Sequence, residues 1–310
     1  MSKAVTSDDS SNDPKPLTFT EIEIPVPWGK IAAMTCGDSS SHPILCLHGL
    51  LDNSASFDRL MHAVSLKSHF FVSIDLPGHG KSSHLEPGTQ YRFLDFLTVV
   101  LRIKQYFQWE RFSIIGHEMG GLLGLYFAAY FPKAVEKLVV LNPVCYLTRN
   151  KDQSQRFIKT AESAYKVQHE PKEITFTTLT DALDYILNLR KTKLSSELLP
   201  VLLRNVYPVG NMYTLSIDSR ISALEFPVIS EKQLYQIFNK ITCELFIITS
   251  SDKREDFKML PVAYFTRLFK KNCVRFGTIT LKGDTDLHLH KPKTVSSQVR
   301  QLFLDFRSSL

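Results

Sequence analysis

Two features are missing from this sequence, and each absence excludes a class of protein. The apolar runs stay well below the roughly 20 residues that span a bilayer, so we expect no stable membrane insertion. The net charge is +6, yet Lys and Arg are interleaved with Asp and Glu and form no block that could follow a phosphate backbone. We therefore expect no nucleic-acid partner.

The sequence also lacks any sign of a disulfide framework or a targeting leader. Its five cysteines are odd in number and widely spaced, without a Cys-x-x-Cys pair, which favours buried thiols in a reducing compartment. The first 16 residues contain Asp8, Asp9 and Asp13 and no apolar stretch, unlike a secretory signal or a mitochondrial presequence. The prediction is a cytoplasmic protein with a disordered leader over residues 1–20.

The last three residues offer an alternative location. Ser308-Ser309-Leu310 differs at one position from the Ser-Lys-Leu peroxisomal signal. The basic middle residue is absent, so peroxisomal import is the alternative and a plain helix end is the simpler interpretation.

The composition is that of a globular protein, with 44% hydrophobic and 22% charged residues. Along the chain, patterns typical of strands alternate with patterns typical of helices. Short apolar runs bounded by turn residues indicate strands buried on both faces of a sheet. The expected strands are 21–27 and 30–36 as an edge hairpin, then 43–47, 70–74, 112–115, 138–141, 245–248 and 278–281. Helical spacing separates them, most clearly at 92–109, 122–129 and 294–306. This alternation predicts βαβ units and a mainly parallel sheet.

The pattern changes between Cys145 and Lys240. Residues 156–167, 180–189 and 194–206 have helical periodicity, with no strand of comparable strength between them. An insertion at this point would lie over the carboxyl ends of the strands, where open α/β sheets bind ligands. We therefore predict a core formed by residues 21–144 and 241–310 and a helical cap formed by residues 145–240.

The segment Gly116-His117-Glu118-Met119-Gly120-Gly121 is the most informative in the chain. It follows an expected strand and precedes an expected helix, which is the context of a serine-hydrolase nucleophile elbow. Glu118 occupies the position of the serine. The sequence thus predicts the place of a reaction without its usual nucleophile.

Together with this elbow, three further motifs give the chain a family resemblance. It resembles the α/β-hydrolases, and more narrowly the serine hydrolase-like (kraken-type) family, from about Glu23 to Phe306. The resemblance implies the α/β-hydrolase fold: a mainly parallel sheet flanked by helices, with a helical cap insertion. The motifs are Val26-Pro27-Trp28-Gly29-Lys30-Ile31-Ala32, Leu45-Cys46-Leu47-His48-Gly49-Leu50-Leu51-Asp52-Asn53 with the following Ser54-Ala55-Ser56-Phe57-Asp58-Arg59-Leu60, and Asp75-Leu76-Pro77-Gly78-His79-Gly80-Lys81-Ser82-Ser83.

The resemblance also assigns the positions of the catalytic machinery. The amides of Leu50 and Met119 would form the oxyanion hole, a part that does not depend on side-chain identity. The histidine position falls on Thr285, and the acid position falls on Asn142 or Asp252. His288 matches a second, normally structural histidine of the family pattern and is the nearest substitute base. His48, His79 and His117 belong to structural positions of the motifs.

Glu118 is a poor replacement for the serine. Related enzymes use an aspartate there, but glutamate is longer by one methylene group, and its carboxylate would overshoot the attack position by about 1.5 Å. The carboxylate would more naturally lie on the oxyanion-hole amides or at the helix N-terminus, both of which favour an anion.

Three functional hypotheses follow. The first is a catalytically impaired homologue that retains a lidded pocket for a small apolar or ester-like ligand, or binds a protein partner. The alternative is an active hydrolase of small carboxylic esters with an atypical centre of Glu118, His288 and Asp252. A metal-dependent variant would use Asp284, Asp286, His288 and His290, but a polar loop before a helix explains these residues equally well. We expect no cofactor and no metal.

Overall fold

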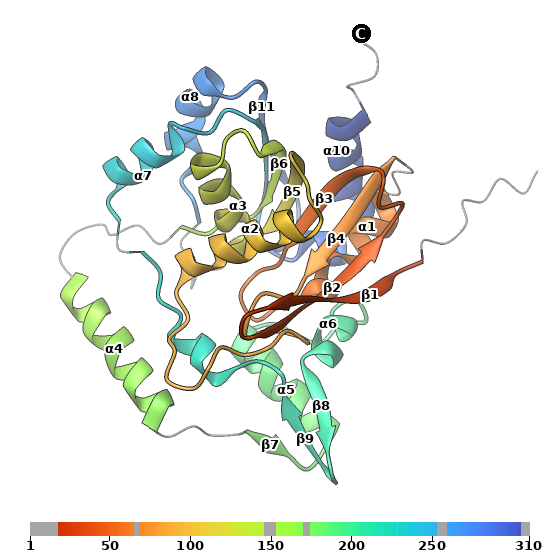
Figure 1. Ribbon diagram of the computed structural model, residues 1–310, viewed down its shortest axis with the longest axis vertical. Coiled ribbons are helices and arrows are strands. Elements are labelled where there is room, and N and C mark those ends of the chain that lie inside the picture. The colour runs from red at the N-terminus through yellow and green to blue at the C-terminus, as the bar shows by residue number, and fades with distance from the viewer. Residues whose placement is uncertain are drawn as a thin grey trace, which may run out of the picture.

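The structure is a computed structural model of the chain and describes residues 18–64, 68–145, 153–169, 174–227, 229–252 and 259–304. An eight-stranded sheet forms its centre, with the strand order β1-β2-β4-β3-β5-β6-β10-β11 (Figure 1). Its strands are β1 (Thr20–Val26), β2 (Gly29–Cys36), β3 (His42–Leu47), β4 (His69–Ile74), β5 (Phe112–His117), β6 (Val135–Leu141), β10 (Glu244–Ser250) and β11 (Phe276–Leu281). β2 pairs antiparallel with β1 and β4, and the remaining pairs are parallel. The predicted mainly parallel sheet is confirmed.

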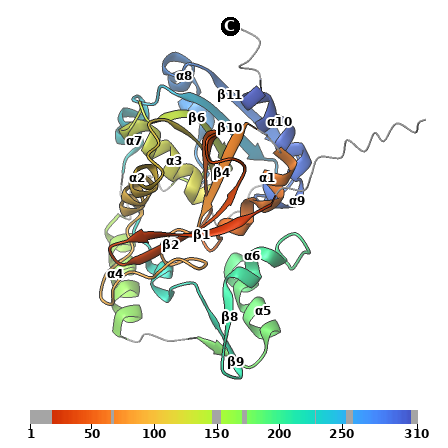
Figure 2. The same ribbon diagram turned by 45° about the vertical axis from the view of Figure 1, so that its right-hand side comes forward.

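Helices cover both faces of this sheet. On β3, Leu45 and Leu47 belong to the hydrophobic cluster that includes α2 (Phe96–Tyr106) and α3 (Glu118–Tyr130). The alternate residues Ile44 and Cys46 belong to the cluster under α1 (Asp58–Val64) and α10 (Pro292–Leu304). Such strands read as continuous apolar runs because successive side chains enter opposite cores. The two layers of helices are visible in Figure 2.

The chain between β6 and β10 forms the insertion. Its described elements are α4 (Gln153–His169), β7 (Thr175–Phe176), α5 (Leu179–Arg190), α6 (Leu199–Arg204), β8 (Val206–Val209), β9 (Met212–Leu215), the 3-10 helix η3 (Ser219–Ala223) and α7 (Glu231–Phe238). Figure 2 shows α5, α6, β8 and β9 together on one side of the core. α7 also falls within the predicted cap range, but its Phe238 packs on Tyr126 of α3 and Phe265 of α8 (Val262–Asn272).

The cap contains a small sheet that the helical periodicity did not indicate. Its strand order is β7-β9-β8, and helix α6 is shorter than the predicted helix over residues 194–206. Gly210-Asn211 connects β8 to β9, with Gly210 at a φ of 57°. A Gly-Asn pair between two short runs is a hairpin signal that competes with helical spacing.

Buried polar contacts attach α6 to the loops that follow β3 and β4. The Asn53 side chain donates to the Val201 carbonyl at 2.7 Å and to Asn205 Oδ1 at 2.9 Å. Arg204 Nε donates to Asp75 Oδ2 at 2.9 Å. Since these loops leave the carboxyl ends of the strands, the cap lies over the edge of the sheet where ligands bind in this architecture.

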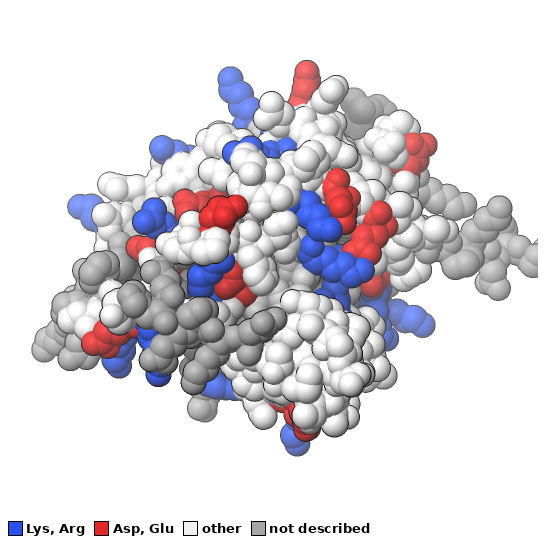
Figure 3. Space-filling view, turned by 60° about the horizontal axis from the view of Figure 1, so that its bottom comes forward, with Lys and Arg blue, Asp and Glu red and all other residues white. Residues whose placement is uncertain are grey.

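Two further observations concern possible partners. In the part of the chain that the structure describes, no helix combines the length and apolarity needed to cross a bilayer. On the face shown in Figure 3, Lys and Arg side chains lie close to Asp and Glu side chains. The exclusion of a nucleic-acid partner stays a prediction.

Candidate functional site

The turn after β5 holds Glu118, the residue expected at the nucleophile position. β5 ends at His117 and α3 begins at Glu118, whose φ of 44° lies in the left-handed region that non-glycine residues rarely adopt. Gly120 lets α3 approach β3, because a Cβ there would lie 2.0 Å from the Leu47 carbonyl oxygen. The chain therefore builds the sharp strand–turn–helix of a nucleophile elbow, with backbone strain at Glu118.

The Glu118 side chain is 4% exposed, and its carboxylate turns toward the loop after β3. A Cβ built on Gly49 of that loop would lie 3.1 Å from Glu118 Oε2, 3.0 Å from His117 Nδ1 and 3.2 Å from Asp52 Oδ2. Three polar side-chain atoms of buried residues therefore lie close to Gly49. The carboxylate occupies space beside the loop that was expected to bind a substrate oxyanion.

The two predicted oxyanion donors flank these residues in the chain. Leu50 follows Gly49 in the loop after β3, and Met119 follows Glu118 in the first turn of α3. Met119 is fully buried, whereas Leu50 is partly buried and lines a cavity. That their amides bind the Glu118 carboxylate stays a prediction.

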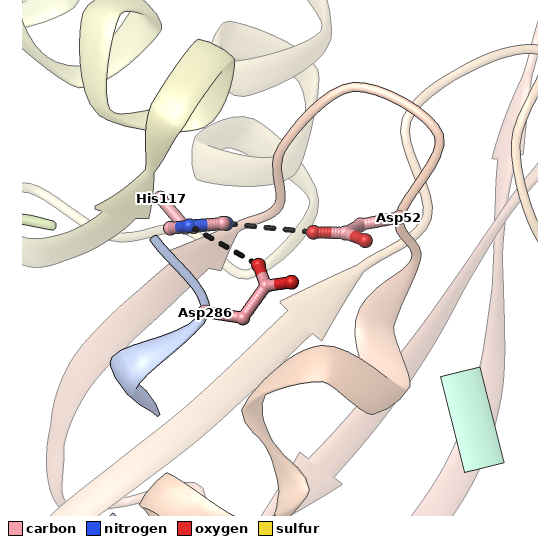
Figure 4. Close-up of side chains that lie close together, drawn as sticks. All are labelled: Asp52, His117 and Asp286. Atoms are coloured by element: carbon pink, nitrogen blue, oxygen red, sulfur yellow. Dashed lines mark ion pairs between the residues drawn. The ribbon is translucent and has the colours of Figure 1, made fainter. Parts of the chain in front are cut away.

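A buried cluster of ionisable side chains, called the charged cluster below, adjoins the elbow. Figure 4 shows three of its members, Asp52, His117 and Asp286. His117 Nδ1 lies 3.4 Å from Asp52 Oδ2, and His117 Nε2 lies 3.8 Å from Asp286 Oδ1. Arg190, the last residue of α5, pairs through Nη1 with Asp52 and through Nη2 with Asp286, the latter at 3.1 Å. None of the four side chains is more than 7% exposed. The cap thus inserts a cation between two carboxylates of the core.

The electrostatics of the cluster depend on this cation. Burial opposes the ionisation of Asp286, but Arg190 and then His117 outweigh it and hold the pKa of the carboxyl below its ordinary value. Asp52, His117 and Asp286 place three ligand atoms within 4.8 Å of one another, which is a spacing that a metal ion could use. Arg190 already pairs with both carboxylates, so a metal ion would have to displace the guanidinium.

Thr285, the residue expected at the histidine position, is buried. Its carbonyl oxygen accepts hydrogen bonds from His117 Nε2 at 2.9 Å and from Asn142 Nδ2 at 2.8 Å. Asn142 Oδ1 in turn accepts from the Ser250 amide at 2.6 Å. The Asn142 side chain therefore joins the ends of β6 and β10 to the loop after β11 by one donated and one accepted bond. An ionised aspartate has no donor and could not make both.

His288 lies beside this network without joining it. Its ring centroid is 4.1 Å from that of His117 and 5.4 Å from that of Phe57. Both ring nitrogens are buried and have no hydrogen-bond partner among the described residues. Burial, followed by the proximity of His117, lowers the pKa of His288 well below its ordinary value, so the ring is neutral and weakly basic.

Asp252, the second residue after β10, forms a separate set of contacts. Its carboxylate accepts from Ser251 Oγ at 2.8 Å, and its amide donates to the Gly283 carbonyl at 3.0 Å. Among the hydrogen bonds and ion pairs of the described residues, none joins Asp252 to His288. The structure gathers Glu118, Asn142, Thr285 and His288 around His117 but does not link His288 to an orienting acid.

Two members of the cluster were missed by sequence reasoning. Asp52 lies in a quoted family motif, but nothing in the motif indicates its pairing with a cap residue. Arg190 is an ordinary basic residue at the end of a helix, where a cation is favoured by the helix dipole. His117 was interpreted as structural, and it is the residue that contacts Asp52, Asp286 and Thr285.

A cavity of about 760 Å³ lies between cap and core. It reaches the core at Leu50 and Leu51, and its wall is mainly apolar. From the cap side it is lined by residues including Val167, Ile174, Leu189, Leu215, Ile217 and Ile221. Glu118, Asp286 and His288 are not among its lining residues. The cavity is of the size that holds small-molecule ligands. It adjoins the loop after β3, and none of the residues of the charged cluster line it.

Known proteins resemble this chain in both sequence and fold. The family profile of the alpha/beta hydrolase fold matches residues 42–167. A serine hydrolase-like protein of Danio rerio is 32% identical over 286 residues, which cover 90% of this chain and 87% of that protein. Serine hydrolase-like protein 2 of Homo sapiens is 29% identical over 300 residues, covering 93% and 95%. The crystal structure of a hypothetical protein from Pseudomonas aeruginosa PAO1 has a TM-score of 0.76 at 23% identity, covering 92% of this chain and 98% of that one.

The parallel sheet, the elbow after β5 and the insertion after β6 define an α/β-hydrolase fold. The resemblance seen in the motifs is confirmed over most of the chain. The chain belongs to the serine hydrolase-like family of α/β-hydrolases.

Proposed function

We propose that this protein is a catalytically impaired member of its family that binds a small apolar or ester-like ligand beneath the cap. The observation that carries the proposal is the composition of the elbow site: Glu118 stands at the nucleophile position and Thr285 at the base position. Acyl transfer by this fold needs a nucleophile with an adjacent base. Neither group is supplied at its expected place.

The neighbouring contacts make simple recovery of activity difficult. Asn142 donates to the Thr285 carbonyl and accepts from the Ser250 amide. Its side chain is an amide and supplies no carboxylate beside residue 285. Arg190 adds a buried guanidinium beside the elbow and ties the cap to it. A histidine introduced at position 285 would meet an amide where it needs a carboxylate.

The cavity supports the binding part of the proposal. Its mainly apolar wall suits an acyl chain or a similar hydrocarbon group, and it includes Leu50 and Leu51 of the loop expected to bind the oxyanion. The ligand would therefore lie beside the loop after β3, without an attacking group next to it. A protein partner on the outer surface is a separate prediction, as are the cytoplasmic location and its peroxisomal alternative. The tripeptide 308–310 lies outside the described residues.

A panel of p-nitrophenyl esters from acetate to decanoate tests the catalytic part. Any turnover by the purified protein should be unchanged in Glu118→Ala, because this residue performs no chemistry. Loss of turnover in that variant would instead establish the atypical hydrolase with Glu118 as a participant. Glu118→Ser with Thr285→His should add no turnover to that of the unchanged protein, since Asn142 and Arg190 still surround the site.

Thermal denaturation in the presence of medium-chain fatty acids and their methyl esters tests the binding part. A ligand that binds the folded state raises the Tm as its concentration passes its Kd. Ile217→Trp would fill part of the cavity and should abolish this shift, whereas Val274→Trp, at a surface position that is 79% exposed, should leave it intact. An equal shift in both variants would place binding elsewhere.

A further inference from the structure

Away from the elbow, a serine, a histidine and a carboxylate are connected by hydrogen bonds at the junction of cap and core. His290 Nδ1 lies 2.8 Å from Asp284 Oδ2, and His290 Nε2 lies 3.3 Å from Ser195 Oγ. The hydroxyl faces one ring nitrogen and the carboxylate faces the other. This is the order of contacts by which a histidine activates a nucleophilic serine, and it is recognised by geometry and not by position in the chain.

Local structure holds each of the three groups. Asp284 Oδ1 accepts a hydrogen bond from the Asp286 amide at 3.0 Å, which fixes the carboxylate. His290 ends the short helix α9 (Leu287–His290), and its amide donates to the Asp286 carbonyl at 3.0 Å. Ser195 begins the turn before α6, where Oγ accepts from the Leu198 amide at 3.2 Å. This last bond leaves the hydroxyl proton free to point at His290.

The site is accessible, unlike the cluster at the elbow. The side chain of His290 is 25% exposed and that of Asp284 is 53% exposed. The hydrogen bond to Asp284 raises the pKa of His290 despite partial burial, and Asp286 acts in the same direction while Arg59 opposes it. Arg59 pairs at 3.0 Å with Glu197, two residues after Ser195, which brings a cation to the same region.

We propose that Ser195, His290 and Asp284 form a second nucleophilic site that accepts the acyl group of a small activated carboxylic ester. Ser195 Oγ forms a bond to the carbonyl carbon while His290 Nε2 takes the hydroxyl proton, and Asp284 stabilises the resulting imidazolium. The bond from the carbonyl carbon to the leaving alcohol then breaks, and the alcohol departs with the proton from His290. Water repeats the sequence on the acyl-serine and releases the carboxylic acid.

This site is independent of the proposed function, because it uses none of the residues of the elbow. The protein would then be inactive at Glu118 and reactive at Ser195. Small activated esters are the expected class, since an exposed site offers little surface to bind a long acyl group.

Labelling of the full-length protein with a fluorophosphonate probe, followed by peptide mapping, tests the proposal. The label is expected on Ser195, and Ser195→Ala should remove it. His290→Gln and Asp284→Asn should slow labelling, the former on the order of a hundredfold, because they remove the base and its orienting carboxylate. The rate in the unchanged protein should rise with pH as His290 loses its proton.

Two control variants test whether a change in the labelling rate comes from the proposed site and not from misfolding or from the elbow. Ser297→Ala removes an exposed hydroxyl that donates to the Thr294 carbonyl on α10, and Glu118→Ala alters the elbow; both should label at the original rate. Circular dichroism confirms that each variant is folded. Absence of the label from Ser195, or an unchanged rate in folded His290→Gln, overturns the proposal. Hydrolysis of p-nitrophenyl acetate that survives Ser195→Ala and disappears in Glu118→Ala overturns the proposed function as well.

Discussion

Replacement of Arg190 by methionine should destabilise the protein strongly and in a pH-dependent way. Methionine keeps much of the side-chain volume but removes the charge that pairs with Asp52 and Asp286. Both carboxylates are at most 7% exposed, so water cannot replace the guanidinium. Removing one partner of a buried ion pair costs about 3–5 kcal/mol. We expect a loss of free energy of unfolding in that range at pH 7.5, measured by urea denaturation.

The sign of the pH dependence follows from the shift of Asp286. With Arg190 present, the pKa of this carboxyl is lower in the folded than in the unfolded state. Its contribution to stability is therefore present above the unfolded pKa, about 4, and is lost as the pH falls through the folded value. Arg190 is the strongest charge that opposes the effect of burial, so we expect its removal to raise the folded pKa of Asp286 and to make the ionised carboxyl costly at neutral pH. The cost of Arg190→Met should be smaller at pH 4.5 than at pH 7.5.

Arg300→Met on the exposed side of α10 is the matched control and should change stability by less than about 0.5 kcal/mol. Adding Asp52→Asn to Arg190→Met removes one of the two unpaired charges and should recover part of the loss. An Arg190→Met cost that equals the control, or that is the same at pH 4.5 and pH 7.5, would refute a buried charge pair between cap and core.

Three further predictions concern the same region. Gly49→Ala brings a Cβ to 3.0–3.2 Å from buried atoms of His117, Glu118 and Asp52, and should cost about 1–3 kcal/mol in urea denaturation; a neutral result would mean that these side chains move freely. Asn142→Asp replaces the donor to the Thr285 carbonyl by an acceptor and should cost about 1–3 kcal/mol at pH 7.5, less at pH 4.5 where the new carboxyl gains a proton. His288→Leu should stay within about 1 kcal/mol of the unchanged protein, because the ring nitrogens have no partners to lose, and should leave any esterase activity unaltered; loss of activity would identify His288 as a base.

The core of the fold could be predicted because its signals are local. The strands β3 and β4 are mostly apolar, and their successive side chains, such as Ile44 and Leu45, enter different cores. Such nearly continuous apolar runs are typical of a parallel sheet. The elbow was also predictable, because Gly116 to Gly121 lies between a strand and a helix whose patterns are clear. The position of Glu118 at the turn between them therefore follows from the sequence alone.

The cap was predicted less well because its signals conflict. Leucine spacing over residues 194–206 favours a helix, while Pro208 and the Gly210-Asn211 turn favour an edge hairpin, and the hairpin is formed from Val206 onward. Short strands such as β8 carry too few residues for periodicity to identify them. Their stability comes from pairing with β9, a partner that lies beyond the window of a local pattern.

The contacts of the site could not be predicted because they join distant parts of the chain. Nothing in the sequence near Arg190 indicates that it pairs with Asp52 or Asp286. The contact between His290 and Ser195 depends on the position of the cap relative to the core. Positions 118 and 285 hold a glutamate and a threonine, and the molecule carries nucleophilic side chains elsewhere, Ser195 among them. Activity measured on this protein therefore has to be assigned to a residue before it is attributed to the elbow. Glu118→Ala and Ser195→Ala make that assignment, because the first changes only the buried site and the second only the accessible one.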